Sequence, residues 1–193
     1  MSRPLHMEFV TSADRLSGLP PTEAEVAVVG RSNVGKSSLI NAIGHSKKLA
    51  KVSNTPGRTR LLNLFAVDGG GSIVDLPGYG YAQASKADRA TWMAMIEAYL
   101  LDREGLNMII VLVDGLVGPT ELDVDMLDWL RDHDLPHTVI ATKHDKVKSS
   151  KRTRRKRDLA AGCQLEEGDV VWVSAHTGTG IDRLRSLLLD WLD

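Results

Sequence analysis

Short apolar runs alternate along the chain with longer stretches in which apolar residues recur at three- and four-residue spacing. Runs of apolar and β-branched residues bounded by turn formers are typical of strands buried in a sheet. Such runs predict strands over residues 25–29, 62–67, 72–75, 108–113, 137–142 and 170–174. The helical spacing predicts helices over residues 38–43, 88–103, 122–130, 150–162 and 181–192.

The order of these elements predicts an α/β fold with three layers. A glycine-rich turn at residues 68–71 joins two strands directly, whereas helices separate the others. We therefore expect a six-stranded, mostly parallel sheet with one antiparallel edge strand and right-handed crossovers. Residues 1–24 hold several turn formers around a short extended segment at 7–10, so we expect an N-terminal arm packed on a domain of residues 25–193.

Composition fits this picture and excludes several classes of protein. The 193 residues are 42% hydrophobic and 25% charged, which is typical of a globular domain with a substantial core. The longest apolar run, residues 108–113, has six residues, far short of the ~20 that a membrane helix needs. The N-terminus lacks the apolar core of a secretory signal, and Cys163 has no second cysteine for a disulfide or a zinc cluster. We expect a cytoplasmic monomer with no membrane partner.

The segment between the first strand and the first helix has the spacing of a phosphate-binding loop, Gly-x4-Gly-Lys-Ser. It reads Gly30-Arg31-Ser32-Asn33-Val34-Gly35-Lys36-Ser37-Ser38. Glycines let the backbone curl, so that successive N–H groups meet phosphate oxygens at the positive end of the helix. We expect Lys36 to reach the outer phosphates and the Ser37 hydroxyl to ligate Mg2+. The strand-to-helix context argues against the alternative, a plain glycine turn.

Three further segments, each at the end of a predicted strand, bear on the choice of nucleotide. Asp75-Leu76-Pro77-Gly78 offers a carboxylate that can hold Mg2+ through a water and a glycine N–H for the γ-phosphate. In Thr142-Lys143-His144-Asp145, the aspartate can accept two hydrogen bonds from guanine that adenine cannot supply, and the lysine stem can cover the base. Ser174-Ala175-His176 can offer a backbone N–H to the guanine oxygen. Ligands of open α/β sheets bind at the carboxyl ends of the strands, where all three segments lie. Since Asp145 favours guanine, we expect GTP and GDP as ligands.

A polar loop before the second strand carries two threonines that could sense the γ-phosphate. Thr55 and Thr59 are both candidates to bring a hydroxyl to Mg2+ and an N–H to the phosphate when triphosphate is present. The other candidate nucleotide-binding residues of this loop are Gly57, Arg58, Arg60 and Leu61. We expect the loop to be disordered without triphosphate.

Together these segments resemble one family. The resemblance is carried by Gly-Arg-Ser-Asn-Val-Gly-Lys-Ser-Ser-Leu-Ile-Asn at residues 30–41, Asn54-Thr-Pro-Gly-Arg-Thr59, Asp75-Leu-Pro-Gly-Tyr-Gly-Tyr-Ala82 and Thr142-Lys-His-Asp145. These are similar to the EngB (YihA/YsxC) family of bacterial ribosome-biogenesis GTPases, from about Phe9 to the C-terminus. The resemblance implies a Ras-like fold, GTP and Mg2+, Thr59 as the switch-loop Mg2+ ligand, and a role in maturing the large ribosomal subunit that supports normal cell division. His144 departs from the family, which commonly has a small residue there.

The residue that follows Gly78 bears on the rate of hydrolysis. Efficient small GTPases place a glutamine there to orient the attacking water, whereas this chain has Tyr79. We therefore predict slow turnover by a catalytic set that includes Lys36 and Thr59. A K+ ion held partly by Asn33, as in related GTPases, would supply the missing charge. Two alternatives stay open: Asn33 as a loop hydrogen-bonder, and Arg58 acting in cis.

Charge is unevenly distributed although the net charge is −1. Residues 146–157 carry eight bases and no acid, whereas residues 114–134 carry seven acids and one base. Six bases lie on the helix predicted to begin at a capping Ser150, namely Lys151, Arg152, Arg154, Arg155, Lys156 and Arg157. They surround the helix, and its dipole disfavours cations in the first turn by ~0.3–1 kcal/mol each. This arrangement favours binding to a phosphate backbone, with rRNA as the expected partner, over a solvated face.

Three functions stay open at this point. In the leading interpretation GTP orders the Thr59 and Tyr79 loops, the ordered surface binds a precursor of the large ribosomal subunit, and hydrolysis releases it. The second is a guanine-nucleotide-controlled rRNA-binding module with incidental turnover. The third is a nucleoside or nucleotide kinase, although no arginine-rich lid near the phosphates is evident.

Overall fold

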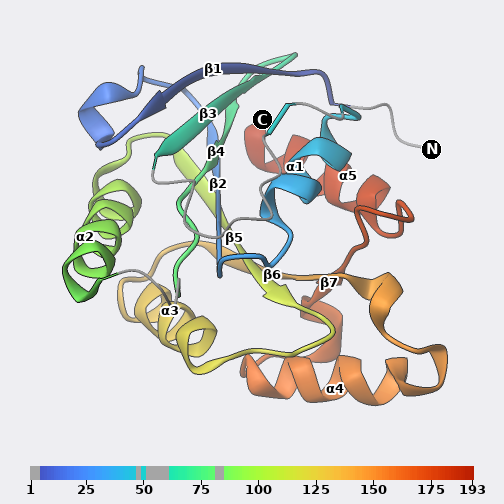
Figure 1. Ribbon diagram of the computed structural model, residues 1–193. Helices are drawn as coiled ribbons and strands as arrows, with labels where there is room; N and C mark the ends of the chain where they lie inside the picture. The colour runs from blue at the N-terminus through green and yellow to red at the C-terminus, as the bar shows by residue number, and fades with distance from the viewer. Residues whose placement is uncertain (1–4, 47–48, 51–60, 81–84) are drawn as a thin grey trace.

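The computed structural model describes residues 5–46, 49–50, 61–80 and 85–193 (Figure 1). A seven-stranded sheet forms its centre, in the order β1-β3-β4-β2-β5-β6-β7. The strands are β1 (Met7–Ala13), β2 (Glu25–Gly30), β3 (Leu62–Val67), β4 (Ser72–Asp75), β5 (Leu106–Asp114), β6 (His137–Thr142) and β7 (Val171–Trp172). The helices are α1 (Lys36–Ile43), α2 (Lys86–Asp102), α3 (Glu121–Asp132), α4 (Arg152–Gly162) and α5 (Ile181–Leu192). The predicted α/β fold is confirmed.

The two faces of the sheet have separate cores because side chains alternate along each central strand. In β2, Val26 and Val28 belong to the core beneath α1 and α5, whereas Ala27 and Val29 belong to the core beneath α2 and α3. Figure 1 shows these two pairs of helices on opposite sides of the sheet. Burial on both faces explains why the central strands read as continuous apolar runs rather than as alternating ones.

The sheet has seven strands instead of the six that we predicted, and the antiparallel strand expected at its edge lies inside it. β3 pairs antiparallel with β4 on one side and with β1 on the other. Only Met7 and Ala13 of β1 are buried, so the strand leaves a weak pattern and the sequence indicated no more than a short extended segment. The division into an arm of residues 1–24 and a domain of residues 25–193 stays a prediction.

Two further boundaries differ from the prediction. β7 has two residues and stops short of Ser174, whose N–H donates to the Thr179 carbonyl in the following turn. α4 begins at Arg152 instead of after a capping Ser150, because a 3₁₀ turn at Ser149–Lys151 precedes it. A short edge strand and a basic helix without a side-chain cap are both difficult to delimit from local sequence.

The carboxyl ends of β2, β4, β5 and β6 meet at one edge of the sheet, where α/β folds bind ligands. The loop after β2 leads into α1, and Arg185 of α5 holds the far end of α1. Its Nη2 donates to the Ala42 carbonyl (2.8 Å) and its Nε to the Ile43 carbonyl (3.0 Å). A cation stabilises this end of a helix, so α5 helps to fix the helix that carries Lys36. Within the described residues, none of the helices combines the length and apolarity needed to cross a bilayer.

Candidate functional site

The loop between β2 and α1 has the tight backbone that the glycine spacing predicted. Gly35, at the N-cap of α1, has a φ of 108°, and Asn33 has a φ of 65°. A Cβ at Gly30 would stand 2.9 Å from the Cβ of Leu112, so a larger residue would force β2 and β5 apart. Val34 is buried, which anchors the middle of the loop in the core. The loop is therefore rigid on its inner side, and its N–H groups lie at the start of α1.

Lys36 and Asp75 form a buried ion pair at the centre of the site. The Lys36 ammonium donates to Oδ1 of Asp75, and less than a tenth of either side chain is exposed. Asp75 is the last residue of β4 and lies opposite Val28 of β2, which brings it beside the phosphate-binding loop. The pair thus places two groups side by side: an ammonium that can bind phosphate oxygens, and a carboxylate that can accept a hydrogen bond from a water molecule of hydrated Mg2+.

The predicted Mg2+ donors fit that ion better than they fit other metals. Ser37 follows Lys36 in the first turn of α1, so a hydroxyl and the Asp75 carboxylate both belong to this corner of the site. Mg2+ prefers oxygen ligands and keeps several waters, completing its shell with substrate phosphates. In the part of the chain that the structure describes, no group of three or more His, Cys, Asp or Glu residues could hold a metal by itself.

The segment after Asp75 is tied to the phosphate-binding loop by its backbone. The N–H of Ser32 donates to the Tyr79 carbonyl (2.9 Å), and the N–H of Tyr79 donates to the Gly30 carbonyl (3.3 Å). A Cβ on Gly78 would come within 3.1 Å of the Ser32 backbone, so this close approach favours glycine. Movement of the segment after Asp75 would therefore displace the phosphate-binding loop, and the reverse.

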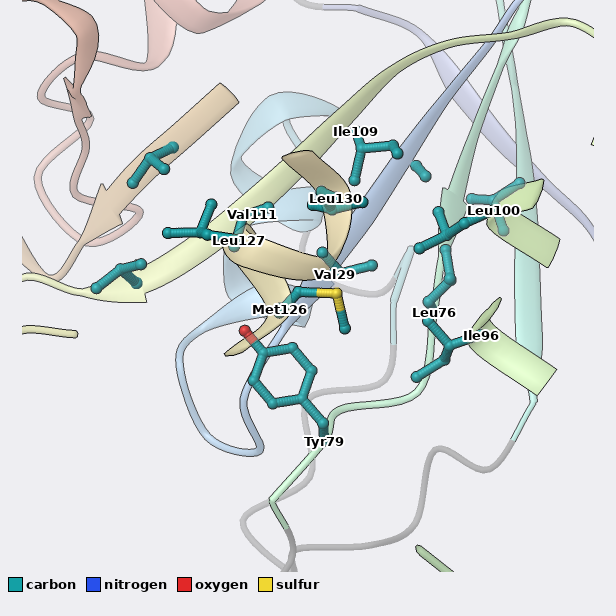
Figure 2. Close-up of a cluster of buried hydrophobic side chains, with 14 of the residues drawn as sticks. Val29, Leu76, Tyr79, Ile96, Leu100, Ile109, Val111, Met126, Leu127 and Leu130 are labelled. Atoms are coloured by element: carbon teal, nitrogen blue, oxygen red, sulfur yellow. The ribbon is translucent and has the colours of Figure 1, made fainter. Parts of the chain in front are cut away.

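The side chain of Tyr79 points into the core (Figure 2). Only 5% of the residue is exposed, and its hydroxyl donates to Oδ1 of Asp123 at 2.9 Å. Burial, followed by the neighbouring Asp123 carboxylate, raises the pKa of Tyr79 well above its usual value. The other Asp123 oxygen accepts from the N–H and the hydroxyl of Thr120, the N-cap residue of α3. The phenol is thus a neutral donor that connects this segment to α3.

The predicted guanine-binding turn after β6 contacts the phosphate-binding loop directly. The Thr142 hydroxyl donates to the Val34 carbonyl (2.6 Å), and the Lys143 ammonium donates to the Asn33 carbonyl (2.9 Å). The same ammonium donates to Oδ2 of Asp114 (2.6 Å). We did not identify Asp114 from sequence, although its place at the end of β5 matches that of the other site carboxylates at strand ends. Asp114 fixes the ammonium end of the Lys143 side chain and leaves the methylene stem to form one wall of the predicted base site.

Asp145 is oriented by Ser174. The Ser174 hydroxyl donates to Oδ1 of Asp145 at 2.7 Å, and it accepts from the N–H of Thr177 at 3.1 Å. The hydrogen bond from Ser174 lowers the pKa of Asp145, so the carboxylate is ionised at neutral pH. Because the Ser174 N–H is already donated within its turn, the backbone donors left for a guanine oxygen are those of Ala175 and His176.

Part of the predicted site falls in the segment before β3. Thr55, Gly57, Arg58, Thr59 and Arg60 lie outside the described residues. Leu61, the next residue, is 40% exposed and precedes β3. The roles assigned to this loop therefore stay predictions.

The six bases of the predicted RNA-binding helix divide into two sets, which the sequence did not indicate. Lys151, Arg154 and Arg157 are exposed, whereas the other three are partly buried against the domain. Those three are Arg152, which donates to the Val147 carbonyl, Arg155, which donates to the Val117 carbonyl, and Lys156, which lies over the Trp172 ring. The bases surround the helix as predicted, but only the outward set is exposed, and Arg154 and Arg157 of that set lie within ion-pair distance of Asp158.

Comparison with known proteins identifies the relatives of this chain. The family model described as 50S ribosome-binding GTPase matches residues 25–143. A probable GTP-binding protein EngB from Pelotomaculum thermopropionicum is 44% identical over 187 residues, which is 96% of this chain and 94% of that protein. The protein of the same name from Clostridium acetobutylicum is 44% identical over 179 residues, covering 92% of this chain and 90% of its own length.

Solved structures share the fold. The crystal structure of a probable GTP-binding protein EngB superposes with a TM-score of 0.70 at 24% identity, covering 88% of this chain and 98% of that one. Era in complex with MgGDPNP and a segment of 16S ribosomal RNA gives a TM-score of 0.69 at 22% identity, covering 90% and 58%. NFeoB from S. thermophilus bound to GDP, AlF4− and K+ gives 0.62 at 23% identity, covering 87% and 62%.

Proposed function

This chain belongs to the EngB family of GTP-binding proteins and is a GTPase, and we propose that it is a slow molecular switch that assists assembly of the large ribosomal subunit in the cytoplasm. The observation that carries the proposal is the clamp between the guanine-binding turn and the phosphate-binding loop. Thr142 and Lys143 each donate to a carbonyl of that loop, so base and phosphate sites are held in one arrangement. The Ser174 hydroxyl holds the Asp145 carboxylate in place, and this carboxylate would select guanine by accepting its two hydrogen bonds.

The proposed residue roles follow from the chemistry of phosphoryl transfer, which depends on positioning and charge stabilisation. Lys36 would exchange Asp75 for the outer phosphates of GTP. Ser37 and Thr59 would ligate Mg2+ directly, and Asp75 would do so through a water. When bound, Mg2+ would supply charge neutralisation on the phosphate oxygens. The remaining nucleotide contacts would come from backbone N–H groups of the phosphate-binding loop and from Gly78.

Slow turnover is supported by the place of Tyr79. Its side chain points into the core and its hydroxyl is committed to Asp123, so it does not reach toward a water beside the γ-phosphate. Lys36 and the backbone donors would still stabilise charge, but water would have to be oriented by another group. That group would be a bound cation or a residue supplied by a partner.

We expect hydrolysis to be faster in KCl than in NaCl, because K+ would be held partly by the exposed Asn33 and would add positive charge near the phosphates. NFeoB, a protein of the same fold, contains K+ in its complex with GDP and AlF4−. Single-turnover hydrolysis should be measured in both salts at equal ionic strength. Asn33→Ala should remove the difference between the salts. Equal wild-type rates in the two salts would remove K+ from the proposal and leave Asn33 as a loop hydrogen-bonder.

The exposed bases of α4 are the surface that we assign to rRNA. We expect Arg154→Ala/Arg157→Ala to weaken binding to large-subunit particles and to lower the slope of log K against log salt by about 1.4–1.8, since two phosphate contacts are lost. Binding should be measured by co-sedimentation over a series of salt concentrations. Arg15→Ala/Arg183→Ala removes two exposed bases elsewhere and serves as the charge-matched control. An unchanged slope in the α4 variant would contradict RNA binding by this helix and would favour the alternative, a solvent-exposed face without a partner.

The proposed switch is tested by co-sedimentation with large-subunit particles in GDP and in a non-hydrolysable GTP analogue. Association in the analogue and release in GDP is the expected result, because the γ-phosphate would order the loops that carry Thr59 and Gly78. Equal association in both nucleotides would contradict a switch. If particles leave single-turnover hydrolysis unchanged, the second function, an rRNA-binding module with incidental turnover, becomes the better description.

A further inference from the structure

One aromatic side chain joins the guanine-binding turn to the basic helix. Trp172 lies in β7 opposite Ala141 of β6, and its ring packs against Gly115 in the loop after β5. A Cβ on Gly115 would stand 2.6 Å from Trp172 Cζ3, so the ring occupies space that only glycine leaves open. Trp172 is therefore in close contact with the loop that follows Asp114, the carboxylate that pairs with Lys143.

His144 and Lys156 lie on this ring from different elements. The His144 and Trp172 rings meet edge to face, with centroids 5.7 Å apart and planes at 69°. The Lys156 ammonium lies 6.0 Å from the centroid of the Trp172 ring, within the range of a cation–π contact. We call these three residues the Trp172 stack. Its members come from the guanine-binding turn, from β7 and from α4.

The turn is also attached to β7 through its backbone. The His144 N–H donates to the Val173 carbonyl at 3.1 Å, so backbone and side chain of the same residue both hold the turn against β7. His144 lies between Lys143, which contacts the phosphate-binding loop, and Asp145, which contacts Ser174. A rotation of the His144 backbone would therefore redirect its neighbours on both sides.

Packing alone does not account for tryptophan at position 172. Its indole Nε1 is buried and has no hydrogen-bond partner among the described residues. A buried donor without a partner is unfavourable, so phenylalanine would fill the site at less cost if packing were the sole requirement. Burial, and then the cations of Arg152 and Lys156, lower the pKa of His144. The imidazole is therefore neutral at neutral pH and can lie near Lys156 without repulsion.

We propose that the Trp172 stack positions the guanine-binding turn, so that His144, Trp172 and Lys156 set the direction of the Asp145 carboxylate and thereby the discrimination between purine bases. This inference rests on the proposed reading of guanine by Asp145. It gives Lys156 a task separate from that of the outward bases of α4. Lys156 serves the nucleotide site, whereas Arg154 and Arg157 face the solvent.

The test measures release of a fluorescent GDP analogue and the ratio of affinities for GDP and inosine diphosphate. Hypoxanthine lacks the exocyclic amine that Asp145 would bind, so the ratio reports carboxylate placement and is insensitive to general loosening. Trp172→Leu and His144→Ala should speed release and reduce the ratio by roughly two- to tenfold, the value of one aromatic contact. Trp172→Phe keeps a ring for both neighbours but offers Lys156 a weaker cation–π face than indole does, so it should reduce the ratio less than Trp172→Leu does.

A second tryptophan–histidine pair, formed by the partly buried Trp129 of α3 and the exposed His133 just after it, supplies the matched control. Trp129 and His133 have ring centroids 4.2 Å apart, and Trp129→Leu and His133→Ala should leave release and ratio unchanged. A wild-type ratio in both stack variants, or an equal loss in the control pair, would overturn the inference. His144→Ala alters a partly exposed residue and keeps the test valid if Trp172→Leu fails to fold. If wild type itself does not prefer GDP to ADP, the proposed guanine recognition fails, and the inference fails with it.

Discussion

Replacement of Lys36 by alanine is expected to reduce GTP hydrolysis by about 10²–10³-fold, because one charged donor to the reacting phosphates is lost. The protein without nucleotide should also become less stable. Lys36 and Asp75 are buried together, and removal of one partner leaves the other charge uncompensated, at about 3–5 kcal/mol. Single-turnover hydrolysis and thermal unfolding without nucleotide measure the two effects separately.

The double variant Lys36→Ala/Asp75→Asn separates these causes. Without either charge the site holds no unpaired ion, so the double variant should be more stable than Lys36→Ala and than Asp75→Asn, whereas hydrolysis should stay low. Lys36→Arg keeps the charge but changes its shape, and it should retain stability better than Lys36→Ala. Hydrolysis near the wild-type rate in Lys36→Ala, with the fold intact, would contradict the role of this lysine.

The second large effect is expected from Asp145→Asn. A carboxylate accepts from both N1–H and the exocyclic amine of guanine, whereas an amide offers one acceptor and one donor. The variant should therefore lose affinity for GDP and gain affinity for xanthosine diphosphate, which carries a carbonyl in place of the amine. The GDP to xanthosine diphosphate ratio should change by about 10²–10⁴-fold, as expected for buried polar mismatches. Competition against a fluorescent GDP analogue measures the ratio.

The hydrogen bond between Ser174 and Asp145 provides a matched control for Asp145→Asn. Ser174→Ala removes the hydroxyl that orients Asp145 but leaves the carboxylate in place. It should weaken GDP binding while preserving the order of preference among the bases. If Asp145→Asn kept the wild-type preference, another residue would have to read the base.

The parts of the site that the sequence predicted are those encoded by short segments. The loop from Gly30 to Ser37 and the turn from Thr142 to Asp145 each combine a recognisable spacing with a buried strand before it. Such signals are local, because glycine conformation and strand ends depend on a few neighbouring residues. The same reasoning predicted the central strands and most of the helices.

The parts that the sequence did not predict depend on contacts between distant segments. Lys143 and Asp114 are 29 residues apart, and Tyr79 and Asp123 are 44 residues apart. No local pattern specifies which carboxylate a lysine or phenol will meet once the sheet has formed. The pairing of β1 with β3 and the division of the α4 bases are of the same kind. Each is decided by tertiary packing.

The central claim, that this site selects a guanine nucleotide, is tested most directly by competition at the wild-type protein. Increasing GTP or ATP should be added to the protein carrying a fluorescent GDP analogue, with Mg2+ present, and displacement followed to equilibrium. The structure leads us to expect displacement by GTP at concentrations at least about a hundredfold below those needed for ATP. Equal displacement by the two nucleotides would contradict guanine recognition by Asp145.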